Sequence, residues 1–405
     1  MISAQSVVAK GNPNKLYYLD GMRGLLAINV VLCHFVCVYF PQMYFEVQAE
    51  QSSGFLSLFA TTPLTATVNG DIAVMYFMAL TGFLVGMSTF VKRNCSIKLF
   101  VKKSVSRYTR LLPTILTATL ITYFTMIFNL QNHLSITDNL VNISFLQSYC
   151  NFSPDIKSLL INIFIKPFLI GSDYIGPFWT IKYEFLGYIL TLFLAMTLKD
   201  NKYRRFIYIG AAIIIAILSK FKFPLVDMYY IVFIMGLFVA DLRFNQKETI
   251  LSKYYSNFLN SKLCLILCYV IGTYFSCCTM FRTPLYSWWF SIPVINKSLL
   301  RGAGMVIIIF AFTQTKAIQK VLSWKPLLAL GKCSFETYAI HWPLMLTLEA
   351  YLFIVFREKM SYIFSALLAF FITVPIIYLA SFLMHYLVDK YIKLLKNLKL
   401  RKTKT

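Results

Sequence analysis

The chain of 405 residues is strongly apolar and carries few charges. Hydrophobic residues make up 58% of it and charged residues only 14%, against roughly 25% in an average soluble domain. Its net charge of +23 does not indicate a nucleic-acid partner, because the cations are too few and the apolar runs too long for such a surface. The nine cysteines show no C-x-x-C spacing, so neither a disulfide framework nor a metal site such as zinc is expected. Lipid is the expected solvent for most of the chain.

Ten apolar stretches are candidate membrane spans, since a crossing needs about 20 mostly apolar residues. They are 18–41, 72–91, 111–130, 177–198, 206–219, 226–242, 263–281, 299–313, 334–356 and 362–388. Lys166 and Pro167 interrupt a further stretch, 156–170, which we interpret as an interfacial or re-entrant helix, with a crossing as the alternative. The fold class is therefore all-α, with one membrane domain at 1–388 and a basic cytoplasmic tail at 389–405.

The distribution of positive charge predicts the orientation of these spans, because short loops rich in Lys and Arg stay cytoplasmic. With the N-terminus inside, 27 of the 39 Lys and Arg residues fall on the cytoplasmic face and eight on the opposite face. Both termini are therefore expected in the cytoplasm. The first span has no long basic segment before it and no A-x-A-like cleavage site, so it is expected to be retained.

The first span carries charged and titratable residues, and a charge at the centre of a span costs about 2.5–3.5 kcal/mol, so each is a candidate functional residue. Arg23 and His34 are 11 residues apart. At roughly 100° per residue both lie on one helix face, about 16 Å apart along the axis. Asp20 is expected to cap the helix N-terminus, and Gly21 and Gly24 would let a neighbour approach. Alternatively, Arg23 is a snorkelling anchor and His34 bonds to a neighbouring carbonyl.

The basic segment before the third span ends in two arginines, Arg107 and Arg110, which share a helical face ahead of Pro113. Arginine offers paired donors to phosphoryl oxygens, so two guanidinium groups at the inner surface could hold phosphates. The alternative is a plain topology signal or contact with anionic lipid.

The fourth span begins near Trp179, which fits an aromatic belt at the outer interface. Glu184 lies deeper and needs either a partner or a water-filled cavity. An interhelical salt bridge without chemistry is the alternative for Glu184.

The ninth span contains His341 and Trp342 directly before Pro343. Proline removes a backbone donor and kinks a helix, which frees the carbonyl of Ala339. The His and the Trp could shape a pocket there, or His341 could be a structural residue bonded to the freed region.

The remaining polar residues near the spans receive no functional role from the sequence. His133 and His385 are interpreted as incidental. Asp227, Arg301 and Glu349 lie at or near span ends, where snorkelling or pairing explains them.

Four ordered blocks of the chain resemble the acyltransferase-3 family of integral membrane O-acyltransferases. The blocks are Tyr17 to Leu25 followed by His34, which is similar to the family's Arg-x10-His signature; Arg107 to Pro113; Trp179 to Glu184; and Leu330 to Leu344. The resemblance covers nearly the whole chain. It implies a fold of about ten spans that moves an acyl group, most often acetyl, from cytoplasmic acyl-CoA to a hydroxyl on an extracytoplasmic glycan.

The resemblance also implies roles for individual residues. His34 corresponds to the family's essential histidine and Arg23 to its partner, while Glu184 and His341 match other recurring positions. As a neutral imidazole, His34 could take the proton of the acceptor hydroxyl while the hydroxyl oxygen attacks the thioester. A direct acyl-histidine intermediate is the less favoured variant. Arg23 would orient the donor.

On this hypothesis the other candidates divide between the donor and the acceptor. Arg107 and Arg110 would hold the nucleotide phosphates, whereas Asp20, Trp179, His341 and Trp342 are acceptor-side or structural candidates. Glu184 joins His34 and Arg23 as a catalytic candidate. No bound cofactor is expected, because acyl-CoA enters as co-substrate. The expected partners are acyl-CoA, a glycan or lipid-linked sugar, and membrane lipids.

Two other classes of protein also fit buried polar residues. A proton-coupled transporter places Arg, His and Glu inside spans, but it predicts internal repeats, which are not visible. A structural or lipid-binding membrane protein would leave these residues unrelated to one another. The expected location is the inner membrane of a bacterium, with a surface polysaccharide such as O-antigen or capsule as the expected acceptor.

Overall fold

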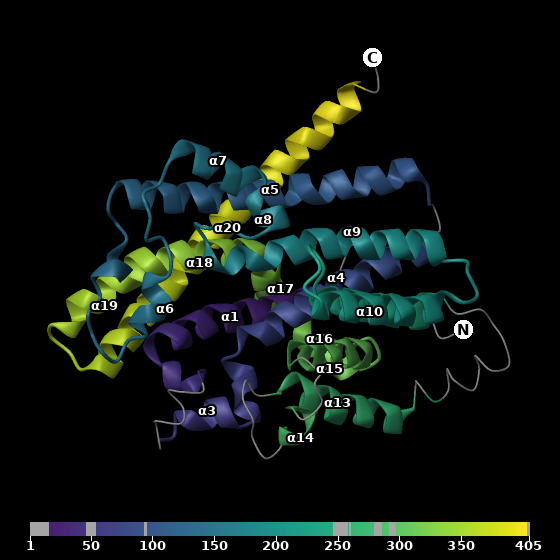
Figure 1. The fold of residues 1–405 in the computed structure, drawn as a ribbon, viewed down its shortest axis with the longest axis horizontal. Helices are drawn as coiled ribbons and strands as arrows, with labels where there is room; N and C mark the ends of the chain where they lie inside the picture. The colour runs from purple at the N-terminus through teal and green to yellow at the C-terminus, as the bar shows by residue number, and fades with distance from the viewer. Residues whose placement is uncertain are drawn as a thin grey trace. The chain divides into compact units, whose positions relative to one another are not determined.

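The regular elements are helices throughout the part of the chain that a computed structural model describes (Figure 1). The described residues are 16–45, 54–92, 95–245, 258, 261–278, 286–290 and 297–402. Within these ranges no strand is found, which confirms the all-α prediction. Of the predicted basic tail, residues up to Lys402 continue the last helix and 403–405 lie outside the described residues, as do 279–281 of the seventh predicted span.

Six helical segments among the described residues are long and apolar enough to cross a membrane. They are α1 (Tyr17–Tyr39), α4 (Gly70–Lys92), α5 (Ile97–Ile127), η4 with α9 (Gly176–Leu198), α18 with η5 and α19 (Ser334–Arg357), and α20 (Tyr362–Lys402) through Leu394. The pair α15 (Lys297–Phe312) and α16 (Lys316–Leu322), bent by 103°, makes a seventh if it is one span. The arrangement of ten spans with cytoplasmic termini stays a prediction.

Shorter helices occupy the other predicted spans and the connections. α10 (Arg204–Lys220), α11 (Tyr229–Phe244) and α13 (Lys262–Ser276) lie where spans were expected but have only 17, 16 and 15 residues. The connections contain η1 (Pro41–Met43), α3 (Ser57–Thr61), η2 (Pro63–Thr67), η3 (Asn132–Ser135), α6 (Ile143–Gln147), α7 (Ile156–Phe164), α8 (Lys166–Leu169), α14 (Ser287–Phe290) and α17 (Lys325–Lys332).

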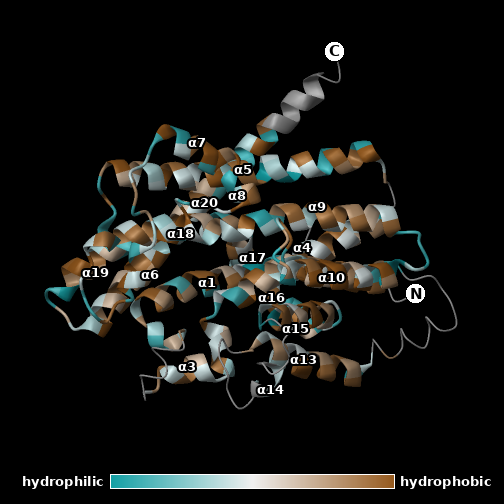
Figure 2. Ribbon diagram, in the orientation of Figure 1, coloured by the Kyte–Doolittle hydropathy of each residue, from teal (hydrophilic) through white to brown (hydrophobic). Residues whose placement is uncertain are grey.

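Apolar residues dominate the long helices, and polar residues gather in connections such as those between α9 and α10 and between α19 and α20 (Figure 2). Large apolar side chains also face outward, among them Phe206, Ile266, Phe371 and Leu379. A protein surrounded by water rarely exposes so many contiguous apolar groups. The chain is therefore an integral membrane protein.

The described contacts divide the chain into two compact units. Unit 1 comprises 1–16, 42–105 and 180–321. In it α4 packs on α9, α11 and α15. Two ion pairs, each with one buried partner, join its helices: Arg301 Nη1 lies 2.8 Å from an oxygen of Asp71, and Arg205 Nε lies 2.7 Å from one of Asp241. Arg301 and Asp241 are the buried partners. The buried charge of Arg301 is therefore explained by pairing, one of the two expected explanations.

Unit 2 comprises 17–41, 106–179 and 322–405, and it contains most of the candidate site residues. Its core includes Val31 of α1, Ile340 of α18 and Ile377 of α20. The N-terminal half of α1 packs on α17. The backbones approach so closely here that a Cβ at Gly21 would overlap the carbonyl of Leu322, the last residue of α16, and one at Gly331 of α17 would overlap the carbonyl of Asp20.

Replacing Gly21 with alanine is expected to destabilise the protein by roughly 1–3 kcal/mol, because the added methyl group forces α1 away from the end of α16 at Leu322. Gly210 on α10 is the matched control, since a Cβ there meets nothing within 4 Å. Thermal unfolding in detergent should show a lower midpoint for Gly21→Ala and no loss for Gly210→Ala. Equal midpoints for the two variants would contradict this packing.

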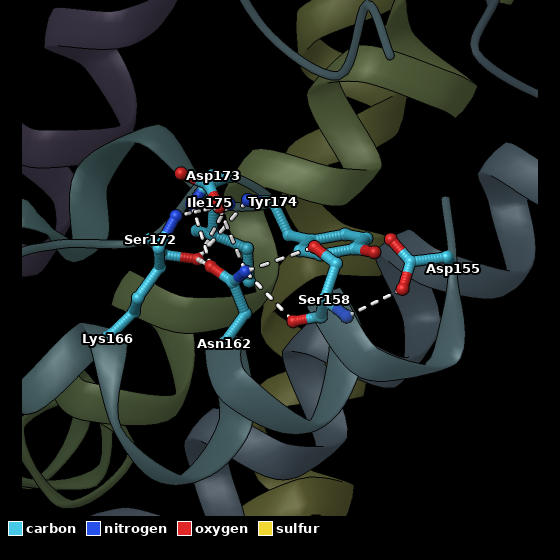
Figure 3. A network of polar contacts seen from close by, with 8 residues as sticks. All are labelled: Asp155, Ser158, Asn162, Lys166, Ser172, Asp173, Tyr174 and Ile175. Carbon is cyan, nitrogen blue, oxygen red and sulfur yellow. Dashed lines mark hydrogen bonds and ion pairs between the residues drawn. The ribbon is translucent and has the colours of Figure 1, made fainter. Parts of the chain in front are cut away.

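The segment predicted to be an interfacial or re-entrant helix forms two short helices, α7 and α8, rather than a crossing. The nine residues of α7 rise only about 14 Å, less than the hydrocarbon thickness of ~30 Å. The side-chain amide of Asn162 donates to the Ser158 carbonyl and to Asp173, each at 3.0 Å (Figure 3). Lys166 also pairs with Asp173, so the chain after α8 is tied back onto α7.

Candidate functional site

His34 and His341 contact each other within unit 2, although 307 positions separate them in the sequence. α1 carries the first and α18 carries the second. Nδ1 of His34 lies 3.1 Å from Nε2 of His341, and the ring centroids are 5.0 Å apart. His341 is fully buried, whereas His34 is partly buried. The structure thus brings together two of the histidines that the sequence singled out.

Contacts with backbone carbonyls indicate which nitrogen of each histidine ring carries the proton. Nδ1 of His34 lies 3.0 Å from the carbonyl oxygen of Val30, and Nδ1 of His341 lies 3.1 Å from that of Thr337. A carbonyl only accepts, so each Nδ1 carries the hydrogen and donates. In a neutral His341 Nε2 is then an acceptor, so the one Nδ1–H of His34 is shared between it and the carbonyl of Val30. The lone pair of His34 consequently lies on its Nε2.

Aromatic side chains pack around this histidine pair. The Trp342 ring meets the His34 ring edge-on at 5.0 Å, and Trp342 is 1% exposed. Tyr149 packs on the other side of Trp342 at 4.8 Å, and Phe145 lies 6.1 Å from it. Trp342 is therefore an integral part of the histidine site.

The inner end of α1 gathers several charges of unit 2. Arg23 lies 3.7 Å from Asp20, and both side chains are partly exposed. Arg110 is exposed and lies within electrostatic reach of Arg107, Arg23 and Glu336. The prediction that Asp20 caps α1 is wrong, because the helix begins at Tyr17 and Asp20 lies inside its first turn. Asp20 pairs instead with Arg23, three residues later on the same helix.

Glu336 and His385 form a hydrogen-bonded pair that the sequence reasoning missed. Nδ1 of His385 lies 3.2 Å from an oxygen of Glu336, and Glu336 is 5% exposed. The prediction that His385 is incidental is therefore wrong. Glu336 stands five residues before His341 on α18, but only the tertiary packing of α18 on α20 pairs it with His385.

Glu184 and Trp179 belong to different units. Glu184 lies on α9 in unit 1, where Thr81 donates to it at 3.1 Å. Trp179 lies in unit 2 and is 38% exposed, as an interfacial belt residue should be. A shared role for Glu184 and His34 stays a prediction.

A π-turn, Met345–Glu349, follows the histidine site directly along the chain. Asn132 donates to the carbonyl of Thr347 at 3.1 Å, and the His133 ring bridges the carbonyls of Leu346 and Tyr149 at 3.2 and 3.1 Å. Burial lowers the pKa of His133 below its usual range, although both carbonyl contacts favour the protonated ring. His133 is fully buried and joins the outer loop to this turn, so it too is not incidental.

The expectation that snorkelling or pairing explains Glu349 is wrong. Its side chain is 0% exposed, and neither of its carboxyl oxygens has a hydrogen-bond partner among the described residues. The outer loop covers the turn that carries it. A hydropathy pattern could not find this, because it placed Glu349 near the end of a span.

No group of three or more His, Cys, Asp or Glu side chains that could hold a metal ion is found in the described ranges. Two clusters of polar groups in unit 2 are candidates for chemistry. The histidine cluster contains His34, His341 and Trp342, and the arginine cluster contains Arg23 and Arg110. The arginine cluster can bind negative charge, and the histidine cluster offers a nitrogen lone pair for proton transfer.

A family model described as an acyltransferase domain matches residues 16–384. The chain belongs to the acyltransferase-3 family. The resemblance read from the four sequence blocks is thereby confirmed. Comparison with curated proteins and with solved structures finds no match.

Family membership and the apolar helices together make this protein a membrane acyltransferase. The family match spans both compact units, so the acyltransferase domain includes Glu184 of unit 1 as well as the histidine pair of unit 2. The histidine cluster of this acyltransferase lies in the first and fourth of the sequence blocks that carried the resemblance.

Proposed function

We propose that this acyltransferase moves an acetyl group from cytoplasmic acyl-CoA to a hydroxyl group of an extracytoplasmic or lipid-linked glycan. The observation that carries the proposal is the lone pair on Nε2 of His34, which follows from the Val30 and His341 contacts of Nδ1. An imidazole held in this tautomer inside a span is suited to general-base catalysis. The family supplies the reaction class.

The donor is proposed to enter from the side of the arginines. Arg23, Arg107 and Arg110 belong to the same unit, and Arg110 lies within electrostatic reach of the other two. Three guanidinium groups suit the phosphates of coenzyme A. From Arg23 to His34 the helix rises about 16 Å, a distance that an extended pantetheine arm can span.

The chemical step that we propose transfers the acetyl group directly. Nε2 of His34 takes the proton of the acceptor hydroxyl as its oxygen forms a bond to the thioester carbonyl carbon. The carbon–sulfur bond then breaks, and the thiolate of coenzyme A leaves and recovers a proton. The products are the acetylated glycan and free coenzyme A, and no oxidant or other reactant is consumed.

The acceptor and the location are also part of the proposal. An O-antigen, capsule or other surface polysaccharide, modified at the inner membrane of a bacterium, suits an acyltransferase whose histidine lies within the membrane. The test is incorporation of labelled acetyl groups from acetyl-CoA into glycan by membranes that contain the protein. A signal that depends on His34 supports the proposal, and its absence overturns it.

Replacing Arg107 or Arg110 with glutamine is expected to raise the KM for acetyl-CoA about 10- to 100-fold, because a hydrogen bond to a charged group contributes roughly 1.5–3 kcal/mol. Acetyl-pantetheine lacks the nucleotide phosphates, so its KM should not change in these variants. Lys102→Gln, an exposed position on the same helix, is the matched control. An equal rise in KM for both donors would contradict phosphate binding by the two arginines.

A further inference from the structure

The two short helices α7 and α8 have no role in the mechanism above, although they carry a dense set of polar contacts within unit 2. Residues 156–173 form a hairpin, because the chain after α8 is tied back onto α7. The Asn162 side chain, 1% exposed, makes this tie with both of its polar atoms: its oxygen accepts from the backbone N–H of Asp173 at 2.9 Å, and its nitrogen donates to the Asp173 carboxylate (Figure 3). A buried polar network whose members are paired makes a segment rigid. The hairpin is therefore a rigid unit.

The polar groups of the hairpin bond to one another and are not arranged around a ligand. Lys166 pairs with Asp173, and the Ser172 hydroxyl donates to the side-chain oxygen of Asn162 at 3.3 Å (Figure 3). Asp155 accepts from the backbone N–H of Ser158 at 2.9 Å and so caps the start of α7. These contacts maintain the shape of the hairpin, and they point to a supporting role.

The hairpin contacts α5 at the turn that carries Arg107 and Arg110. Tyr108 stands between these two arginines, and its hydroxyl donates to the carbonyl oxygen of Phe164 at 3.1 Å. The centroids of the Tyr108 and Phe168 rings lie 4.5 Å apart. Phe164 ends α7, where carbonyl groups have no partner within the helix, so the tyrosine hydroxyl supplies one.

Tyr108 and Arg110 point to nearly opposite sides of α5, because a helix turns by about 100° per residue and two residues make about 200°. The hairpin therefore backs α5 on the side away from Arg110. Arg110 itself lies within electrostatic reach of two further cations and two acids, namely Arg107, Arg23, Glu336 and Asp20. The three arginines repel one another, and the two acids offset this repulsion only in part. A support behind α5 keeps the helix from moving away under this repulsion.

We propose that the hairpin is a brace that holds the turn 107–110 of α5 in the position that binds the donor, with Tyr108 as the positioning residue. The proposal rests on the proposed function, because it assumes that Arg107 and Arg110 hold the phosphates of coenzyme A. A hydrogen bond and a ring contact at one point of α5 fix both its rotation and its distance from the hairpin. Without them the arginines spread apart, and the cost of bringing them together again is taken from the affinity for the donor.

The test uses the full-length protein in lipid vesicles, with lipid-linked glycans extracted from the host membrane as acceptor and acetyl-CoA or acetyl-pantetheine as donor. Tyr108→Phe keeps the ring contact but loses the hydroxyl. Its KM for acetyl-CoA is expected to rise about 3- to 10-fold, within the effect of one lost hydrogen bond. Its kcat and its KM for acetyl-pantetheine, which lacks the nucleotide phosphates, should not change. Tyr108→Leu loses both contacts and should show a larger rise.

Added salt separates the brace from ordinary packing. Salt screens the repulsion between partly exposed charges, so the ratio of the acetyl-CoA KM of Tyr108→Phe to that of the unaltered protein should fall as salt rises. Tyr123→Phe is the matched control, because it makes the same exchange near the other end of α5, where Tyr123 contacts Phe124 and Tyr174. We expect its KM for both donors to stay unchanged.

An unchanged acetyl-CoA KM in both Tyr108 variants would overturn the brace, and so would an equal rise for both donors that salt does not reduce. If Tyr108→Leu does not fold, Tyr108→Phe alone decides the matter. Arg107→Gln is measured in parallel. An unchanged acetyl-CoA KM in Arg107→Gln would overturn the proposed donor site and the brace with it, whereas a raised KM there with unchanged Tyr108 variants would overturn the brace alone.

Discussion

Replacing His34 with glutamine is expected to lower the rate of acetyl transfer by about 10² to 10⁴-fold, which is the usual contribution of a general base. Glutamine can still donate to the carbonyl of Val30, so the fold of α1 should persist. What is lost is the basic nitrogen at the position of Nε2. The donor KM should change little, because the arginines that we propose for donor binding are Arg23, about three turns before His34 on α1, and Arg107 and Arg110 on α5.

The measurement is the rate of labelled acetyl transfer by purified protein, with the unfolding temperature recorded for each variant. His385→Gln is the matched control, because it makes the same exchange at the histidine that pairs with Glu336 and lies outside the His34 and His341 pair. We expect it to keep most of the activity. A His34→Gln variant with a normal rate would show that the proton is removed by another group.

The first and last blocks of the family pattern illustrate what sequence can predict. Arg23, His34 and His341 stand out because polar residues are costly in lipid, and no tertiary information is needed to see this. Most helices also lie close to the predicted spans, because long apolar runs have few alternatives in a membrane. The exceptions are the start of α5, where the basic segment from Ile97 joins the span, and the end of α20, which continues through the basic tail to Lys402. Lys and Arg are good helix formers, so charge alone does not end a helix.

The contacts of the site could not be read from the sequence. The bond between His34 and His341 depends on how α1 packs on α18, and hydropathy contains no information on which faces of two spans meet. The same holds for Glu336 and His385, which come from α18 and α20. Glu349 was misread for a different reason. Distance from a span end predicts exposure only when no loop folds back, and here the chain at Asn132 and His133 covers the turn.

The second large effect is expected at His341, which acts through His34 and is therefore a positioning residue. When Nε2 of His34 takes the substrate proton, the ring becomes a cation whose Nδ1–H points at Nε2 of His341. A hydrogen bond from a charged group contributes roughly 1.5–3 kcal/mol. Its loss in His341→Phe should lower kcat about 10- to 100-fold with the donor KM unchanged. The effect should be smaller than at His34, because the carbonyl of Val30 still holds the tautomer.

His341→Gln separates this role from a purely structural one. The glutamine carbonyl can accept from Nδ1–H of His34, so part of the lost kcat should return, whereas the aromatic ring of His341→Phe fills space but accepts nothing. His341→Phe also loses the bond to the carbonyl of Thr337, which the glutamine amide can still make, so the unfolding temperature is measured for both variants. If the two variants lose equal kcat and equal thermal stability, His341 serves packing. If glutamine restores kcat at an unchanged donor KM, the second imidazole stabilises the charged state of the first.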